Sequence, residues 1–136
     1  MAPTSSPCES LTPYPEILVQ ELLSRSAGRF PDKIAVIDGG HSFTYTQIKE
    51  LSNRFASALA AAGLATGDRV GVYALNCVEF AFGLYGILRA GESASTVNSA
   101  YTERELALQI NDGGASSCWS MKTCWRPPPA RSCAGC

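Results

Sequence analysis

Histidine, net charge and long apolar runs are the features that this sequence of 136 residues has little of. Its net charge of −1 gives no general attraction to nucleic acid or to an anionic membrane surface. The longest apolar stretch, Phe80 to Leu88, is far too short to span a bilayer. Residues 1–15 lack the basic-then-apolar run of a secretory signal. These absences exclude nucleic-acid-binding and membrane-spanning classes and predict a cytoplasmic protein with no transmembrane segment.

Acidic residues are missing from the end of the chain, where none follows Asp112. Residues 117–136 therefore carry +3, whereas eight basic and twelve acidic residues before them leave −4. The same twenty residues hold four of the six cysteines, both tryptophans and three of the eight prolines. Cysteines crowded at one end do not resemble a disulfide framework for the whole chain. Two compositions meet after Ser116, which predicts a flexible leader over 1–15, one domain over 16–116 and a separate tail over 117–136.

Apolar periodicity and turn residues predict an α/β fold for the middle part. Apolar residues make up 46% of the chain and charged residues 17%, as in a globular domain. Thr44 and Gln47 match a capping box, and Thr102 with Glu105 forms a second one. The expected helices are Pro15 to Arg29, Thr44 to Gly63, Cys77 to Ala90 with Asn76 as its cap, and Thr102 to Ile110. The expected strands are Lys33–Asp38, His41–Phe43, Val70–Ala74, about Ala94–Val97, and one entered at Ala115.

Strands and helices alternate from residue 67 onward, and this order has a topological consequence. Each strand–helix–strand unit predicts a right-handed crossover and neighbouring parallel strands. The helix Cys77–Ala90 is apolar almost all round, so it is expected to be buried, and Gly83 and Gly86 would let another backbone approach it closely. We therefore expect a largely parallel sheet with helices on both faces.

Several segments, in order and at matching spacing, resemble one known family. They are Phe30-Pro31-Asp32-Lys33-Ile34-Ala35-Val36-Ile37-Asp38, Phe43-Thr44-Tyr45-Thr46-Gln47-Ile48, Gly67-Asp68-Arg69-Val70, Asn76 with Val78-Glu79-Phe80, Leu88-Arg89-Ala90-Gly91, and Thr96-Val97-Asn98-Ser99-Ala100-Tyr101-Thr102. Together they resemble the opening of the adenylate-forming (AMP-dependent) synthetase/ligase superfamily, including acyl-CoA synthetases and 4-coumarate–CoA ligase. The resemblance covers about Glu16 to Ser116. This sequence departs from the family at two positions. The family usually has a small or apolar residue where Glu92 stands, and often a proline where Ser99 stands.

This resemblance implies the first part of a large N-terminal domain, with an incomplete parallel sheet and flanking helices. Such enzymes are similar in activating a small-molecule carboxylic acid with ATP and Mg²⁺ and passing the acyl group to coenzyme A. The family's phosphate loop, ribose contact and catalytic lysine have no counterpart in this sequence, nor does it hold a Walker-type run. We therefore assign no catalytic, cofactor-binding or metal residue and expect residues 1–136 to be inactive alone. The segment Ser95–Asn98 slightly favours the 4-coumarate and fatty-acyl branches of the family. An incomplete sheet also predicts self-association through its exposed edge.

Five residues in the middle part were weighed as sites, and structural roles are preferred for all of them. His41, the only histidine, is expected on a surface turn because no nucleophile has a recognisable partner arrangement. Cys77 precedes an apolar helix and is expected to be a buried or half-buried structural cysteine. Asp38, Asp68 and Glu79 stand at element ends, which favours capping or solvated roles over paired acid–base chemistry.

The tail offers a non-enzymatic alternative, in which a binding module holds zinc. Cys118, Cys124, Cys133 and Cys136 would be the ligands, and only Cys133-x-x-Cys136 has knuckle spacing. A redox role for that pair is less favoured, because no helix follows to lower a thiol pKa.

A shift of reading frame explains the tail better. In the shifted frame, each new codon consists of the last base of one codon and the first two bases of the next. Read in this way, Cys118-Trp119-Ser120, with a TCN serine codon, encodes Leu-Val. Met121-Lys122 regroups to a forced Glu, and Cys124-Trp125-Arg126, with a CGN arginine codon, to an apolar residue and Leu-Ala. The sequence translated from the shifted frame has the pattern of a buried strand, an acidic loop and an amphipathic helix. The alternation of strands and helices predicts these same elements after Gly114. We interpret 117–136 as an out-of-frame, disordered tail.

Overall fold

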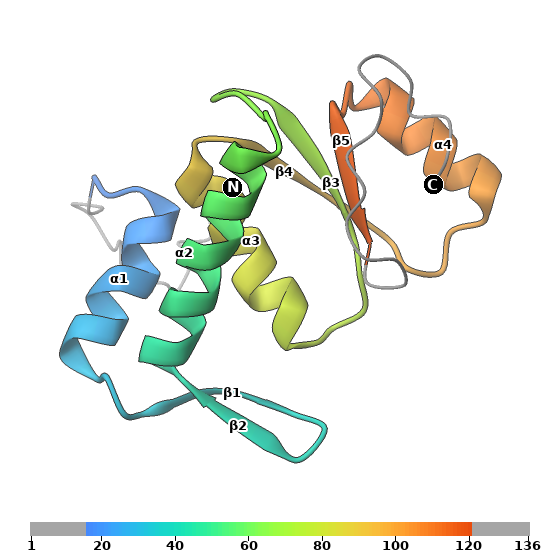
Figure 1. The fold of residues 1–136 in the computed structure, drawn as a ribbon. Helices are drawn as coiled ribbons and strands as arrows, with labels where there is room; N and C mark the ends of the chain where they lie inside the picture. Colours follow the sequence, from blue (N-terminus) through green and yellow to red (C-terminus); the bar gives the residue numbers. More distant parts are fainter. Residues whose placement is uncertain (1–15, 121–136) are drawn as a thin grey trace, which may run out of the picture.

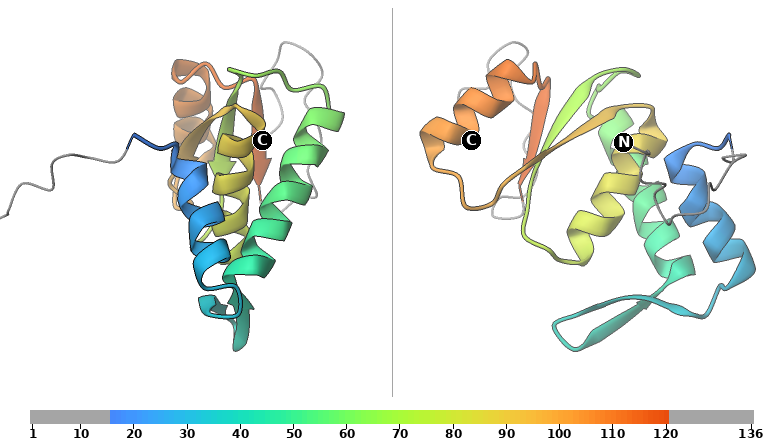
Figure 2. Two further views of the ribbon diagram at one scale, coloured as in Figure 1. Left: turned by 90° about the vertical axis from the view of Figure 1, so that its left-hand side faces the viewer. Right: turned by 180° about the vertical axis from the view of Figure 1, so that it is seen from behind.

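A parallel sheet with strand order β4-β3-β5 is the centre of the computed structural model, which describes residues 16–120 (Figure 1). β3 (Arg69–Tyr73) lies between β4 (Ser93–Val97) and β5 (Ser117–Ser120), and both neighbours run parallel to it. α3 (Val78–Ala90) connects β3 to β4, and α4 (Glu103–Asp112) connects β4 to β5. The two helices cover opposite faces (Figures 1 and 2). The predicted α/β class with a parallel sheet is confirmed.

The main core lies between the sheet and the helices α2 (Tyr45–Ala61) and α3, with α1 (Val19–Arg29) packed outside them (Figure 2). Val70 and Val72 of β3 are fully buried here against Leu59 and Ile87. Trp119 of β5 joins the same cluster and is 7% exposed. Because Val70 pairs with Ser117 and Val72 with Trp119, alternate residues of β5 face this core.

Among the described elements, α4 is the helix that covers the opposite face of the sheet. Val97, Leu106, Ile110 and Ala115 form its buried cluster, and Tyr73 and Cys118 pack against it. Tyr73 also donates a hydrogen bond of 3.0 Å to the carbonyl oxygen of Ser99.

A separate antiparallel hairpin, β1 (Ile34–Asp38) and β2 (His41–Thr44), precedes α2 (Figure 1). Gly39 and Gly40 make its turn with φ of 55° and 83°, values that glycine adopts without steric cost. The predicted capping box at Thr44 is confirmed: the Thr44 hydroxyl accepts from the Gln47 N–H at 3.3 Å, and the Gln47 side chain accepts from the Thr44 N–H at 2.8 Å.

Three predicted boundaries were wrong. α1 begins at Val19 rather than at Pro15, because Leu18, at the N-cap, has an extended backbone with φ of −71° and ψ of 144°. α3 has Cys77, not Asn76, at its N-cap. The chain also continues as β5 through Ser120, so the described fold extends four residues past the predicted junction at Ser116. Within the described range, no helix is both long and apolar enough to cross a membrane.

Candidate functional site

The candidate site is a pocket of about 220 Å³ where the end of β1 meets the start of α3. It lies beyond the carboxyl end of β3, on the path from that strand into α3. In doubly wound sheets, ligands commonly bind at this end, where successive connections leave for opposite sides. Its lining residues are Val36, Ile37, Asp38, Asn76, Cys77 and Phe80.

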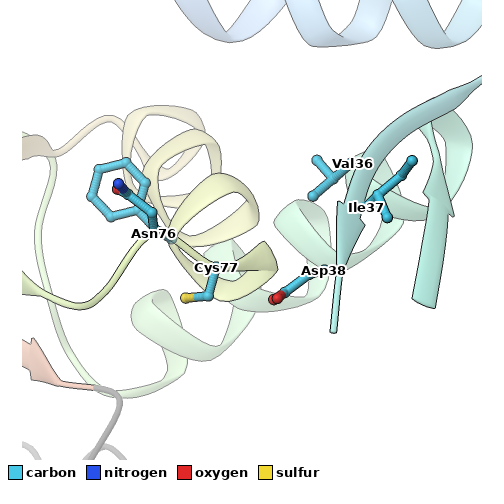
Figure 3. A pocket seen from close by; sticks show the side chains of 6 residues that line it. Val36, Ile37, Asp38, Asn76 and Cys77 are labelled. Carbon is cyan, nitrogen blue, oxygen red and sulfur yellow. The ribbon is translucent and has the colours of Figure 1, made fainter. Parts of the chain in front are cut away.

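Asp38 closes the helix end of this pocket. Its carboxylate reaches from β1 towards the first turn of α3 (Figure 3), where Oδ2 accepts a hydrogen bond of 2.9 Å from the Val78 N–H. The predicted capping role is thus confirmed, although the capped helix lies forty residues further along the chain. A carboxylate at a helix N-terminus is stabilised by the exposed N–H groups there. Helix N-termini of this kind also attract phosphate groups, and here the Asp38 carboxylate accepts from the Val78 N–H.

Cys77 lines the same pocket as a half-buried side chain, as predicted. Its Sγ donates a hydrogen bond of 3.1 Å to the Leu75 carbonyl oxygen. Burial raises the pKa of the Cys77 thiol, and the neighbouring Glu79 raises it further, although the Phe80 N–H opposes this rise. The thiol is therefore kept protonated at neutral pH and is a poor nucleophile.

The structure does not bring the other candidate residues into this pocket. His41 is exposed on the hairpin, and Glu79 lies in the first turn of α3. Asp68 belongs to a turn at the amino end of the sheet, where its Oδ2 accepts a 2.8 Å hydrogen bond from the Ala65 N–H. Cys118 packs on the α4 side of β5, while Cys124, Cys133 and Cys136 lie outside the described residues. From residue 16 to residue 120, no three potential metal ligands come together.

Glu92 is the notable residue whose position sequence reasoning missed. It is only 5% exposed, and its Oε2 has no hydrogen-bond partner among residues 16–120. The sequence indicated this position in one way, because the adenylate-forming family usually has a small or apolar residue where Glu92 stands.

The contribution of the long-range cap can be measured with two substitutions of Asp38. Asp38→Ala removes the acceptor for the Val78 N–H and is expected to lower the free energy of unfolding by about 1 kcal/mol. Asp38→Asn keeps an oxygen acceptor and is the matched control, expected to lose about half of that or less. Urea denaturation followed by circular dichroism measures both. Equal losses in the two variants would contradict the capping geometry.

The fold is a doubly wound α/β unit, and in its pocket the Asp38 carboxylate caps α3. Comparison with known families identifies it: the chain belongs to the AMP-binding enzyme family, which matches residues 23–133. The predicted family is confirmed. The matched range includes most of the tail that the composition had set apart.

Two curated relatives illustrate the similarity and its extent. The chain is 40% identical over 98 residues to a long-chain-fatty-acid–CoA ligase of Salmonella typhimurium, covering 71% of this chain and 18% of that protein. It is 38% identical over 104 residues to the Bacillus subtilis long-chain-fatty-acid–CoA ligase, covering 76% and 19%. The chain therefore spans less than a fifth of the length of these relatives.

Solved structures show the same fold in the amino-terminal parts of related proteins. A Mycobacterium tuberculosis fatty acyl CoA synthetase superposes with a TM-score of 0.69 at 31% identity, covering 73% of this chain and 20% of that one. The Klebsiella oxytoca NpsA N-terminal subdomain, solved with anthranilyl-AMSN, superposes with a TM-score of 0.73 at 25% identity, covering 76% and 27%.

Proposed function

We propose that residues 16–120 are the amino-terminal part of a ligase that activates a fatty acid with ATP and transfers it to coenzyme A. The observation that carries this proposal is the similarity to long-chain-fatty-acid–CoA ligases over most of the chain. The likeness to a fatty acyl CoA synthetase structure supports the same substrate class. We place the reaction in the cytoplasm.

In this proposal the described residues supply the scaffold, and other parts of the ligase hold ATP, Mg²⁺ and coenzyme A. The support is the crevice itself, because the Asp38 carboxylate occupies the helix end that would otherwise attract a phosphate. Adenylation also needs fixed donors and a metal to stabilise the charge that develops during transfer. Accordingly, no residue from 16 to 120 is assigned a catalytic or cofactor-binding role.

A pyrophosphate-exchange assay with a fatty acid tests this division of labour. The 136-residue chain is expected to give no exchange above the buffer control, whereas a chain continued in the family's reading frame is expected to be active. Exchange by the 136-residue chain would contradict the proposal. A zinc determination on the same reductant-treated sample separates the alternative, because stoichiometric zinc would favour a metal-holding cysteine tail.

We also propose that residues 117–136 arise from a shifted reading frame. The support is the abrupt change in composition after Ser116, together with the family-like text obtained by regrouping the codons. The family match through residue 133 weighs against a complete change of sequence in the tail. The nucleotide sequence decides whether the frame is shifted, since an early stop codon in the shifted frame would eliminate the frameshift hypothesis.

Self-association through a sheet edge stays a prediction, to be measured by the molecular mass in solution.

A further inference from the structure

The amino end of the parallel sheet holds a buried acid that has no counter-ion in the described part of the chain. Glu92 lies between the end of α3 and the start of β4, and its N–H donates to the Ile87 carbonyl oxygen at 3.2 Å. Glu92 is 5% exposed, and its Oε2 meets no hydrogen-bond partner in the range that the structure describes. An ionised carboxylate here would have one oxygen, Oε2, shielded from water and without a hydrogen-bond donor among the described residues.

The arginines on the elements next to Glu92 bond to other groups and do not compensate a charge on its carboxylate. Arg89 of α3 donates its guanidinium N–H to the Ser24 hydroxyl of α1 at 3.0 Å. Arg69 of β3 donates to the Gly113 carbonyl oxygen at 2.7 Å. The segment from Phe55 to Gly67, which includes the end of α2, contains no titratable side chain. Within residues 16–120, no ion pair includes Glu92.

Asp68 is the titratable group that acts on Glu92 across the turn. Burial raises the pKa of Glu92, and the negative charge of Asp68 raises it further. Asp68 is also the structural centre of this edge: its carbonyl oxygen accepts from the Ser93 N–H at 2.8 Å, and Oδ1 accepts from the Ser116 hydroxyl at 3.4 Å. Repulsion between the two carboxylates therefore acts where β3, β4 and β5 begin.

We propose that Glu92 is a proton-sensitive switch at the amino edge of the sheet. When Glu92 is protonated, the turn 65–68 stays closed against the start of β4. When Glu92 is ionised, the buried charge and Asp68 repel each other, and water enters this edge.

The direction of the pH dependence follows from the raised pKa. A carboxyl group whose pKa is higher in the folded state stabilises the fold below its unfolded pKa, and this contribution is lost as the pH rises through the folded value. Acidification from neutral pH should therefore tighten the edge, in contrast to the usual effect of acid on paired carboxylates.

Amide hydrogen exchange of the full chain tests the switch locally. Three amides report on the edge: Gly67 donates to Gly91, Ser93 to Asp68 and Ser116 to Arg69. Their protection, corrected for intrinsic exchange, is expected to rise severalfold on acidification from about pH 7 to about pH 5, because the pKa of Glu92 is raised in the folded state. The Tyr45 amide, which donates to Lys33 at the hairpin, is the internal control and should not change.

Glu92→Gln should show the high protection at both pH values, because the neutral amide copies the protonated acid. Glu92→Ala, which restores a small residue, serves the same purpose if the glutamine variant does not fold. Asp68→Asn should reduce the pH effect without abolishing it, because burial of Glu92 remains. The switch is overturned if wild-type protection is independent of pH, if Glu92→Gln keeps the dependence, or if Tyr45 changes equally.

Discussion

Trp119→Ala is expected to lower the free energy of unfolding by about 3–5 kcal/mol, a large part of the total stability of a domain this size. Trp119 is 7% exposed in the core between the sheet and α2 and α3. Its ring centroid lies 5.1 Å from that of Phe55 and 6.4 Å from that of Phe82. Truncation would remove these contacts and leave a cavity that the helices fill only in part.

Urea denaturation of the full chain, followed by circular dichroism, measures this loss. Tyr101→Ala is the matched control, because Tyr101 is an aromatic residue that is 39% exposed, and its loss should change stability by less than about 0.5 kcal/mol. If Trp119→Ala were as mild as the control, β5 would not belong to the stable fold and the ordered part would end before Ser117. The result therefore also decides how much of the tail is structural.

Gly86→Ala is expected to destabilise the protein by about 1–3 kcal/mol although alanine is the better helix former. A Cβ at Gly86 of α3 would lie 2.9 Å from the Ser52 carbonyl oxygen of α2 and 2.9 Å from Phe55 Cδ1. The first of these is helix backbone, which cannot move without separating α2 from α3. The cost of this overpacking therefore exceeds the gain of about 1 kcal/mol in helix propensity.

Gly28→Ala in α1 is the matched control, with the opposite sign expected. No atom of the described residues lies within 4 Å of a Cβ built at Gly28, so only helix propensity applies and a gain of about 0.5–1 kcal/mol should follow. Thermal unfolding of both variants gives the comparison. A stabilising Gly86→Ala would contradict the close contact of α2 with α3.

Gly83 shows how far the sequence could predict such contacts. The two glycines on an apolar helix predicted the close approach of another backbone, and the structure confirms this at Gly86 but not at Gly83. Gly86 faces a helix backbone, but a Cβ at Gly83 would come within 2.6 Å of the Trp119 ring. That partner could not be predicted, because Trp119 lies in the segment whose composition suggested a separate tail.

The cap of α3 shows a second limit of sequence reasoning. Asn76 had the right residue type next to the helix, yet Asp38 accepts the hydrogen bond from the Val78 N–H. Rules of helix capping concern residues within one turn of the helix end, as at Thr44, where the prediction is confirmed. They cannot anticipate an acceptor brought from a hairpin forty residues away.

Local sequence patterns were enough to predict the alternation of strands and helices, the parallel direction of β3, β4 and β5, and the family. These depend on local periodicity, on turn residues and on short motifs, all of which are complete within a few residues. Three other features follow from packing: Trp119 fills the space over Gly83, Asp38 caps α3 from the hairpin, and Glu92 is buried beside Asp68. Each of these depends on residues far apart in sequence, whose contact is set by how the helices pack on the sheet.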